Sequence, residues 1–408
     1  MIQLFYSHFR LSCLLLSLGF LLVSCRDKDV VEALPVTVTV SYPSTYAVKA
    51  GAGITVTLES TTGGEKLPAQ TTDANGTVRF PSVLPGTYTV SATQALSATD
   101  AERITNVFRQ ALTLNAVQRS VSITASSNQT ISLELAGAPA GTLLIKEVYY
   151  TASKTPNNGN YFSDQFVEIY NNSDSTIALD GLCIADVYGV SGQINPNSTP
   201  TDFKDDTRHV YLNSVWRIPG TGRQHLLEPG KSILIAQDGI NHQTDPAGNP
   251  NSPVNLANAD WETYNQRPDN RDTDSPSVPN LERVYFTGGF DWLLPVFGPG
   301  LVIFRTSDFN TLEKVAIPSA ASLEPRIKLP IGQIIDAFEG LQDANSGAFK
   351  RIPASVDAGF VFASGTYTSE SFRRKTATTL NGRRVLQDLN NSGSDFEKLS
   401  KPTPRSFQ

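Results

Sequence analysis

TDANGTVRF at residues 72–80 is the strongest indication that the N-terminal part of the chain is built from β-strands. Within it, Asn75-Gly76 favours a two-residue β-hairpin turn, because both residues tolerate positive backbone φ angles. Upstream, VTVTV at residues 36–40 and ITVTL at residues 54–58 alternate apolar and polar side chains. A period of two in β-branched residues is typical of half-buried strands. We therefore expect strands joined by tight turns.

The composition of the whole chain agrees with an all-β fold. The 408 residues include 29 glycines and 25 prolines, only one methionine, and 18% charged residues. Such a composition is typical of short strands and many turns, and the length suffices for two hydrophobic cores. The net charge of −6 disfavours nucleic acid as a partner, because non-specific binding requires basic residues that neutralise phosphates.

The N-terminus carries a candidate export signal. Residues 11–23 are mostly leucine, follow Arg10, and end in LLVSC at residues 21–25, which resembles a bacterial lipobox. The apolar run is short for a membrane span and has the form of a signal-peptide core. We expect a lipoprotein signal peptide at residues 1–24, lipidation of Cys25 and a tether at residues 25–34. An ordinary secretory signal cleaved nearby is the alternative.

The expected location is the outer membrane, with the lipid-anchored protein facing the cell surface. The charged stretch RDKD at residues 26–29 follows the lipidation site and partly resembles a surface-export signal. Removal of residues 1–24 would leave only Cys25 and Cys183, so an intrachain disulfide is not expected. Cys183 lies in an apolar stretch, where a lone cysteine is usually a small buried residue.

Two resemblances divide the rest of the chain. TDANGTVRF together with LPGTYTV at residues 84–90 resembles the carboxypeptidase-regulatory-like and Cna-B-like β-sandwiches, which implies a first domain at residues 35–138. The second resemblance is to a lamin-tail domain. It rests on LLIKEVYY from residue 143, QFVEIYNNS from residue 165 and LDGLCIAD from residue 179, and it implies a second domain at residues 139–408. The small-residue stretch AGAPAG at residues 136–141 is expected to link them.

The expected fold is therefore all-β, with two tandem immunoglobulin-like or prealbumin-like β-sandwiches. The second sandwich is enlarged by long inserts at residues 187–225 and 237–300. Loops on a rigid sandwich often carry the function of a domain, so we expect the functional residues in these inserts. The whole chain resembles exported outer-membrane lipoproteins of Bacteroidetes type, from a family whose domain has no known function.

Motifs for catalysis are missing from the sequence. His209, His225 and His242 are isolated, and no G-x-S-x-G, P-loop or dinucleotide motif is present. We expect a non-enzymatic protein without a cofactor. A cryptic hydrolase stays open, because a chain with 39 acidic residues always offers carboxylate pairs.

Two polar stretches are weak candidates for Ca²⁺, a cation that prefers oxygen ligands. One contains Asp272 and Asp274, and the other is DLNNSG at residues 388–393 with Asp388 and Asn390. An EF-hand would need Glu at position twelve of the second stretch, where this chain has Leu399. Ordered turns are the favoured interpretation of both, so no metal site is expected.

Aromatic residues gather in the second insert, and four of them are candidate contacts for a partner or a glycan: Trp261, Tyr264, Phe290 and Trp292. The alternative is that they cover a second side of the sandwich. Our leading hypothesis is a binding or accessory subunit of an outer-membrane transporter, such as a TonB-dependent one, or of a β-barrel complex. A glycan-binding surface module is the first alternative, and the cryptic hydrolase is the second.

Overall fold

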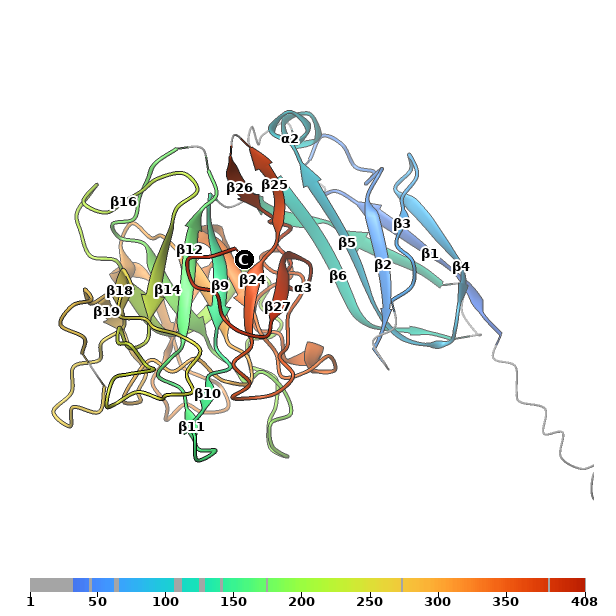
Figure 1. Ribbon diagram of the computed structural model, residues 1–408. Coiled ribbons are helices and arrows are strands. Elements are labelled where there is room, and N and C mark those ends of the chain that lie inside the picture. Colours follow the sequence, from blue (N-terminus) through green and yellow to red (C-terminus); the bar gives the residue numbers. More distant parts are fainter. Residues whose placement is uncertain are drawn as a thin grey trace, which may run out of the picture.

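The computed structural model describes residues 32–43, 46–61, 66–105, 112–124, 129–139, 142–173, 175–272, 274–380 and 382–407. It confirms an all-β fold with two tandem sandwiches (Figure 1). One cluster of buried hydrophobic residues draws all its members from residues 36–135, and the other clusters begin at residue 143. No helix among these residues is long and apolar enough to cross a membrane.

The first sandwich packs a sheet of three strands against a sheet of five. The first sheet has the order β4-β1-β7, and the second has the order β3-β2-β5-β6-β8. The first domain also contains helix α2, which spans Ala98–Thr105. The strands are β1 Leu34–Ser41, β2 Thr55–Ser60, β3 Gln70–Thr71, β4 Thr77–Val83, β5 Gly86–Leu96, β6 Leu112–Ile123, β7 Gln129–Glu134 and β8 Ala136–Pro139.

The turn at Asn75-Gly76 differs from the prediction. It does not close a hairpin, because β3 pairs with β2 whereas β4 pairs with β1 in the other sheet. The Asp73 carboxylate accepts hydrogen bonds from the backbone N–H groups of Asn75 and Thr77, both at 2.9 Å. Gly76 has φ of +76°, and a Cβ there would lie 2.4 Å from the Val40 carbonyl oxygen. The Asn-Gly signal thus marks a close crossing between the two sheets.

The second domain packs a six-stranded sheet, β18-β17-β12-β9-β24-β27, against a seven-stranded one, β21-β22-β15-β14-β20-β23 with β19 beside β15. The strands of the first sheet are β9 Leu143–Tyr149, β12 Phe166–Asn171, β17 Ser232–Ala236, β18 Trp261–Glu262, β24 Ser371–Arg374 and β27 Phe396–Leu399. Those of the second are β14 Cys183–Val187, β15 His209–Arg217, β19 Glu282–Tyr285, β20 Gly300–Phe304, β21 Glu313–Val315, β22 Arg326–Pro330 and β23 Ile334–Glu339.

Smaller elements complete this domain. Three short pairs of strands lie outside the two large sheets: β10 Ser153–Lys154 with β11 Asn160–Tyr161, β13 Ile177–Ala178 with β16 Leu226–Leu227, and β25 Thr376–Leu380 with β26 Arg383–Leu386. The short helices are η2 Phe309–Thr311, η3 Ile331–Gln333, η4 Ser346–Phe349 and α3 Ser392–Asp395.

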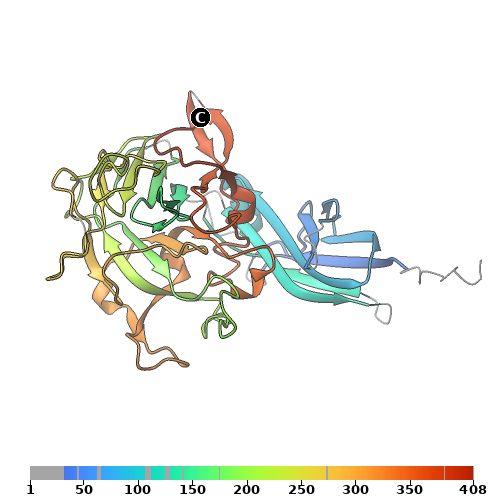
Figure 2. The same cartoon turned by 60° about the horizontal axis from the view of Figure 1, so that its bottom comes forward.

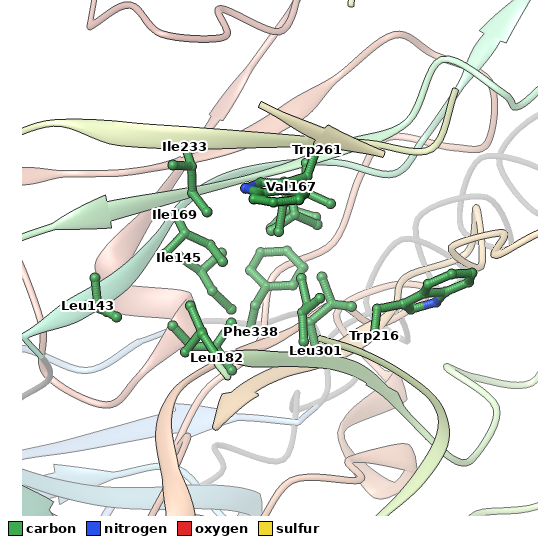
Figure 3. Packing of buried hydrophobic residues seen from close by; sticks show 14 of the residues in the cluster. Leu143, Ile145, Val167, Ile169, Leu182, Trp216, Ile233, Trp261, Leu301 and Phe338 are labelled. Atoms are coloured by element: carbon green, nitrogen blue, oxygen red, sulfur yellow. The ribbon is translucent and has the colours of Figure 1, made fainter. Parts of the chain in front are cut away.

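The main core of the second domain lies between its two large sheets (Figure 3). Ile145, Val167 and Ile233 point into it from one sheet, and Leu301 and Phe338 meet them from the other. Cys183 is buried on the outer face of the second sheet, as the sequence predicts. Another buried cluster covers the outer face of the six-stranded sheet. Because that sheet is covered on both faces, LLIKEVY in β9 and FVEIYN in β12 are buried at every position.

The inserts belong to the sandwich more closely than the sequence suggests. Residues 187–225 contain β15, which pairs with β14, β19 and β22 inside the seven-stranded sheet. Residues 237–300 supply Val254, Leu256 and Val278, which pack on the outer face of the six-stranded sheet. These segments are structural parts of the domain as well as loops.

The two domains meet along β6. Asn115 Nδ2 donates a hydrogen bond of 2.8 Å to the Leu389 carbonyl oxygen, and Thr113 Oγ1 donates one of 3.2 Å to that of Asp388. Figure 1 shows β6 passing beside α3. The expected linker is shorter than AGAPAG, because Ala136–Pro139 forms β8 and pairs with β6. β1 starts at the end of the first sandwich that lies away from the second domain (Figures 1 and 2).

Candidate functional site

The predicted contact role of Trp261 and Trp292 is wrong for this structure. Their exposed fractions are 7% and 5%, and both indoles belong to the core between the two large sheets. Trp292 Nε1 donates a hydrogen bond of 2.8 Å to Asp186 Oδ1, and the Trp261 ring meets the His225 ring edge-on at 4.9 Å. Both side chains are already satisfied by the protein, so they offer no surface to a ligand.

The other two predicted contacts are half-buried. Phe290 lies 6.4 Å from Phe162 between ring centroids, and the guanidinium of Arg271 stands 4.2 Å above its ring. Tyr264 is also half-buried. Cys25, the predicted lipidation site, lies outside the described residues.

Asp388 and Asn390 belong to the domain junction and do not form a calcium loop. The Asp388 carboxylate is 3.6 Å from the buried Arg374 guanidinium, which supplies a positive charge there. Asn390 has φ of +49°, and its carbonyl oxygen accepts from Asn115 at 3.4 Å. Asp274 is exposed and accepts a hydrogen bond from Asn280.

The fourth calcium candidate, Asp272, lies in a buried acidic cluster with Asp238 and Asp291. One carboxylate oxygen of each residue lies within 4.8 Å of those of the other two. Asp238 comes two residues after β17, Asp272 lies in the loop between β18 and β19, and Asp291 lies in the loop between β19 and β20. Their exposed fractions are 4%, 5% and 5%. All three belong to the insert at residues 237–300.

Neighbouring groups satisfy only part of this cluster. Gln237 Nε2 donates to Asp291 Oδ2, and the Asn265 backbone N–H donates to Asp272 Oδ2 at 2.7 Å. Within the part of the chain that the structure describes, Gln237 Oε1, Asp238 Oδ1 and Asp291 Oδ1 are buried and have no hydrogen-bond partner. Buried polar atoms are normally paired, so each of these requires an explanation.

Because the three carboxylates are buried and close together, the cluster attracts protons and cations. Burial, followed by the charges of Asp291 and Asp272, raises the pKa of Asp238 to about 9. Burial also raises the pKa of Asp291 to about 6, although the hydrogen bond from Gln237 opposes it. Closely spaced buried carboxylates cannot all ionise without a counter-charge, so the cluster must hold protons or a cation.

A separate hollow of about 590 Å³ opens beside the insert at residues 187–225. Its lining includes Tyr188, exposed amides of Asn195 and Asn197, and the side chain of Arg326. The Arg326 guanidinium lies 4.7 Å above the Tyr188 ring. Polar side chains, including the charged Asp202 and Arg326, next to an aromatic ring suit a polar ligand such as a sugar.

The sequence alone pointed to only part of the acidic cluster and did not reveal the hollow. Asp272 stands in a conspicuous polar stretch, whereas Asp238 and Asp291 are isolated acidic residues without a recognisable spacing. The hollow lies at the first insert, residues 187–225, in which the sequence suggested no candidate binding residue. The signal in the sequence would have been the run of asparagine, proline, serine and threonine at residues 195–201.

The fold and these sites define a tandem β-sandwich protein with an insert-rich second domain. Residues 228–403 match the family "Protein of unknown function (DUF4876)", and residues 38–122 match "BOS complex subunit NOMO1-like, second beta sandwich domain". The C-terminal match is to a family of unknown function, in agreement with the expected resemblance, and the N-terminal match is to a β-sandwich domain.

Among solved structures, the chain is similar to a DUF4876 family protein from Bacteroides thetaiotaomicron. The identity is 25%, the match covers 89% of this chain and 94% of that one, and the TM-score is 0.57. A "putative adhesin" from Bacteroides ovatus matches at 6% identity over 38% of this chain and 55% of its own, with a TM-score of 0.18. No curated protein matches the chain.

Proposed function

We propose that this protein is a non-enzymatic binding subunit of the bacterial cell envelope, anchored by a lipid on Cys25 and facing the cell surface. The observation that carries the proposal is the order of the parts. A lipobox-like stretch precedes a sandwich whose first strand starts away from the second domain (Figures 1 and 2). The first sandwich would therefore separate the anchor from the larger second domain.

The second domain would bind an outer-membrane partner, such as a TonB-dependent transporter. Phe297 and Phe362 are exposed, at 36% and 42%, although both are large apolar residues. Phe297 lines a hollow of about 330 Å³, and Ala363, next to Phe362, lines it too. Exposed apolar surface beside a concave region is a common feature of protein contacts.

Purification of the full-length protein from detergent-solubilised outer membranes of its own host tests this function. We expect a stoichiometric membrane partner, and a Phe297→Ser, Phe362→Ser double variant should lose it. A Leu323→Ser variant is the matched control, because Leu323 is 52% exposed but does not line this hollow. Recovery of the native protein alone would contradict the proposal.

A glycan-binding module is the second candidate, favoured by the hollow beside Tyr188. Affinity electrophoresis across a set of polysaccharides should show retardation of the parent protein. Tyr188→Ala and Asn197→Ala should abolish retardation, whereas Phe362→Ala should preserve it, because it removes an aromatic ring outside this hollow. Equal mobility of the parent with every polysaccharide would remove this candidate.

The hydrolase alternative has less support. Glycoside hydrolysis needs two carboxylates on opposite sides of a bond that the substrate can bring into the site. The three carboxylates that the structure brings together are at most 5% exposed. A polysaccharide chain could not reach them without rearrangement of the surrounding loops.

A further inference from the structure

We propose that Asp238, Asp272 and Asp291, together with the amide oxygen of Gln237, bind one Ca²⁺ ion inside the second insert. This site is independent of the proposed partner and glycan surfaces.

The spacing of the carboxylates suits a single ion. Ca²⁺ is bound by oxygen at about 2.3–2.6 Å, so ligands on opposite sides of it are about 5 Å apart. The three carboxylate oxygens lie within 4.8 Å of one another. An ion placed between them can contact all three without a large movement of the backbone.

The Gln237 side chain is independent evidence for a ligand. It is only 3% exposed, and its Nε2 donates to Asp291 Oδ2. Since the amide oxygen is bonded to the same carbon as Nε2, it is held beside the cluster, yet it accepts no hydrogen bond from any described residue. An unpaired buried acceptor destabilises the folded protein. Coordination to a cation would remove that destabilisation for Gln237 Oε1, Asp238 Oδ1 and Asp291 Oδ1.

The donor atoms favour a hard cation. Every ligand in the set is an oxygen, whereas Zn²⁺ sites usually include histidine or cysteine. His242 is nearby, but its Nε2 lies 3.1 Å from the Asp238 carbonyl oxygen and its Nδ1 lies 2.7 Å from the Tyr161 hydroxyl. Both ring nitrogens are therefore engaged with other partners.

The ion would join three loops that are far apart in the sequence. Asp238 follows β17, Asp291 precedes the core residue Trp292, and Asp272 lies between them. Leu256 and Val278 of the same insert cover the six-stranded sheet. Binding of Ca²⁺ would thus hold the insert against that sheet, and removal of Ca²⁺ would loosen it.

Calorimetric titration of the mature protein with Ca²⁺ alone, after dialysis against a chelator, tests the site. We expect one ion per chain and a melting temperature that rises with Ca²⁺ concentration, as for any ligand that binds only the folded state. Titration with Mg²⁺ should give weaker binding. Tb³⁺ provides a second readout, because excitation of Trp292, next to Asp291, should sensitise its luminescence.

Asp291→Asn and Asp238→Asn should fold, because a neutral amide removes charge repulsion, but should bind Ca²⁺ about 10–100-fold more weakly. Asp274→Asn is the matched control and should bind like the parent, since Asp274 is exposed and outside the cluster. No heat, no Tb³⁺ luminescence and no melting shift in the parent would overturn the proposal. An unchanged Ca²⁺ response in Asp291→Asn would overturn it as well.

Discussion

The two sandwiches are stabilised by different kinds of interior. Every buried polar side chain described in the first is uncharged, namely Thr72, Thr105, Thr113 and Asn115. The second buries charged groups throughout, including Lys146 against Glu168 at 2.8 Å and Arg351 against Glu339 at 2.8 Å. Apolar burial is non-directional, whereas buried ion pairs require one geometry. The larger second domain therefore combines apolar burial with directional contacts between buried charges, whereas the first sandwich relies on apolar burial.

Arg374 is the clearest example of such a contact. Its guanidinium donates to the Ile145 carbonyl oxygen on β9 at 2.9 Å and to Asp336 Oδ2 on β23 at 2.6 Å. It also lies 3.4 Å from Asp395 in α3. One side chain therefore connects both large sheets and the C-terminal segment.

Arg374→Met should produce the largest loss of stability, because it leaves buried carboxylates without their cation. Breaking a buried pair in this way costs about 3–5 kcal/mol of unfolding free energy. Urea denaturation followed by tryptophan fluorescence measures it, since all three tryptophans lie in the second domain. Arg217→Met is the control: its pair with Glu282 is partly exposed and should be worth less than about 1 kcal/mol. Equal losses in the two variants would show that burial of charge does not distinguish the second domain.

Leu58→Ala probes the apolar interior of the first sandwich. Leu58 is fully buried in its core, so the cavity should cost about 3 kcal/mol. Far-ultraviolet circular dichroism should show an earlier transition, whereas the tryptophan transition should keep its midpoint. Leu84→Ala is the control, because Leu84 is 53% exposed. A tryptophan midpoint that shifts with Leu58→Ala would mean that the two sandwiches unfold as one unit.

Asn115→Ala tests the contact between the two regions. It removes the hydrogen bond to the carbonyl oxygen of Leu389, a half-buried residue, at a cost of about 1 kcal/mol. Differential scanning calorimetry should show greater separation of the two unfolding transitions, and Gln118→Ala on an exposed position of β6 should not change them. Unchanged calorimetry in Asn115→Ala would indicate that the junction depends on other contacts.

The smallest expected effect concerns acid stability. The Asp180 carboxylate accepts hydrogen bonds from the backbone N–H groups of Gln224, His225 and Gly222, which lower its pKa to about 2. A lowered folded-state pKa stabilises the protein above about pH 4, and this contribution is lost as the pH falls towards 2.

Asp180→Asn should therefore be less stable than the parent at neutral pH, with the difference shrinking between about pH 4 and 2. Urea midpoints across this pH range measure the effect. Gln224→Ala is the control, because it removes a side chain but keeps the backbone donor. A difference between Asp180→Asn and the parent that does not vary with pH would contradict the assignment.

Local patterns predicted the strands but not their partners. The alternation in residues 36–40 gives β1 with every second residue buried, and QFVEIYNNS contains β12. The Asn75-Gly76 turn was located correctly, yet its strands belong to different sheets. The sequence suggested that Trp261 and Trp292 are exposed loop aromatics, because nothing in the neighbouring residues shows that these parts of the insert fold back onto the core.

The all-β class, the two sandwiches and the export-like N-terminus can be predicted from the amino-acid sequence, because periodicity, turn residues and an apolar run are properties of neighbouring residues. The meeting of Asp238, Asp272 and Asp291 becomes visible only in the folded domain. These residues stand on three loops, and their proximity depends on how the insert packs across the six-stranded sheet. Contacts between distant residues are set by the packing of the whole domain, which no short stretch of sequence contains.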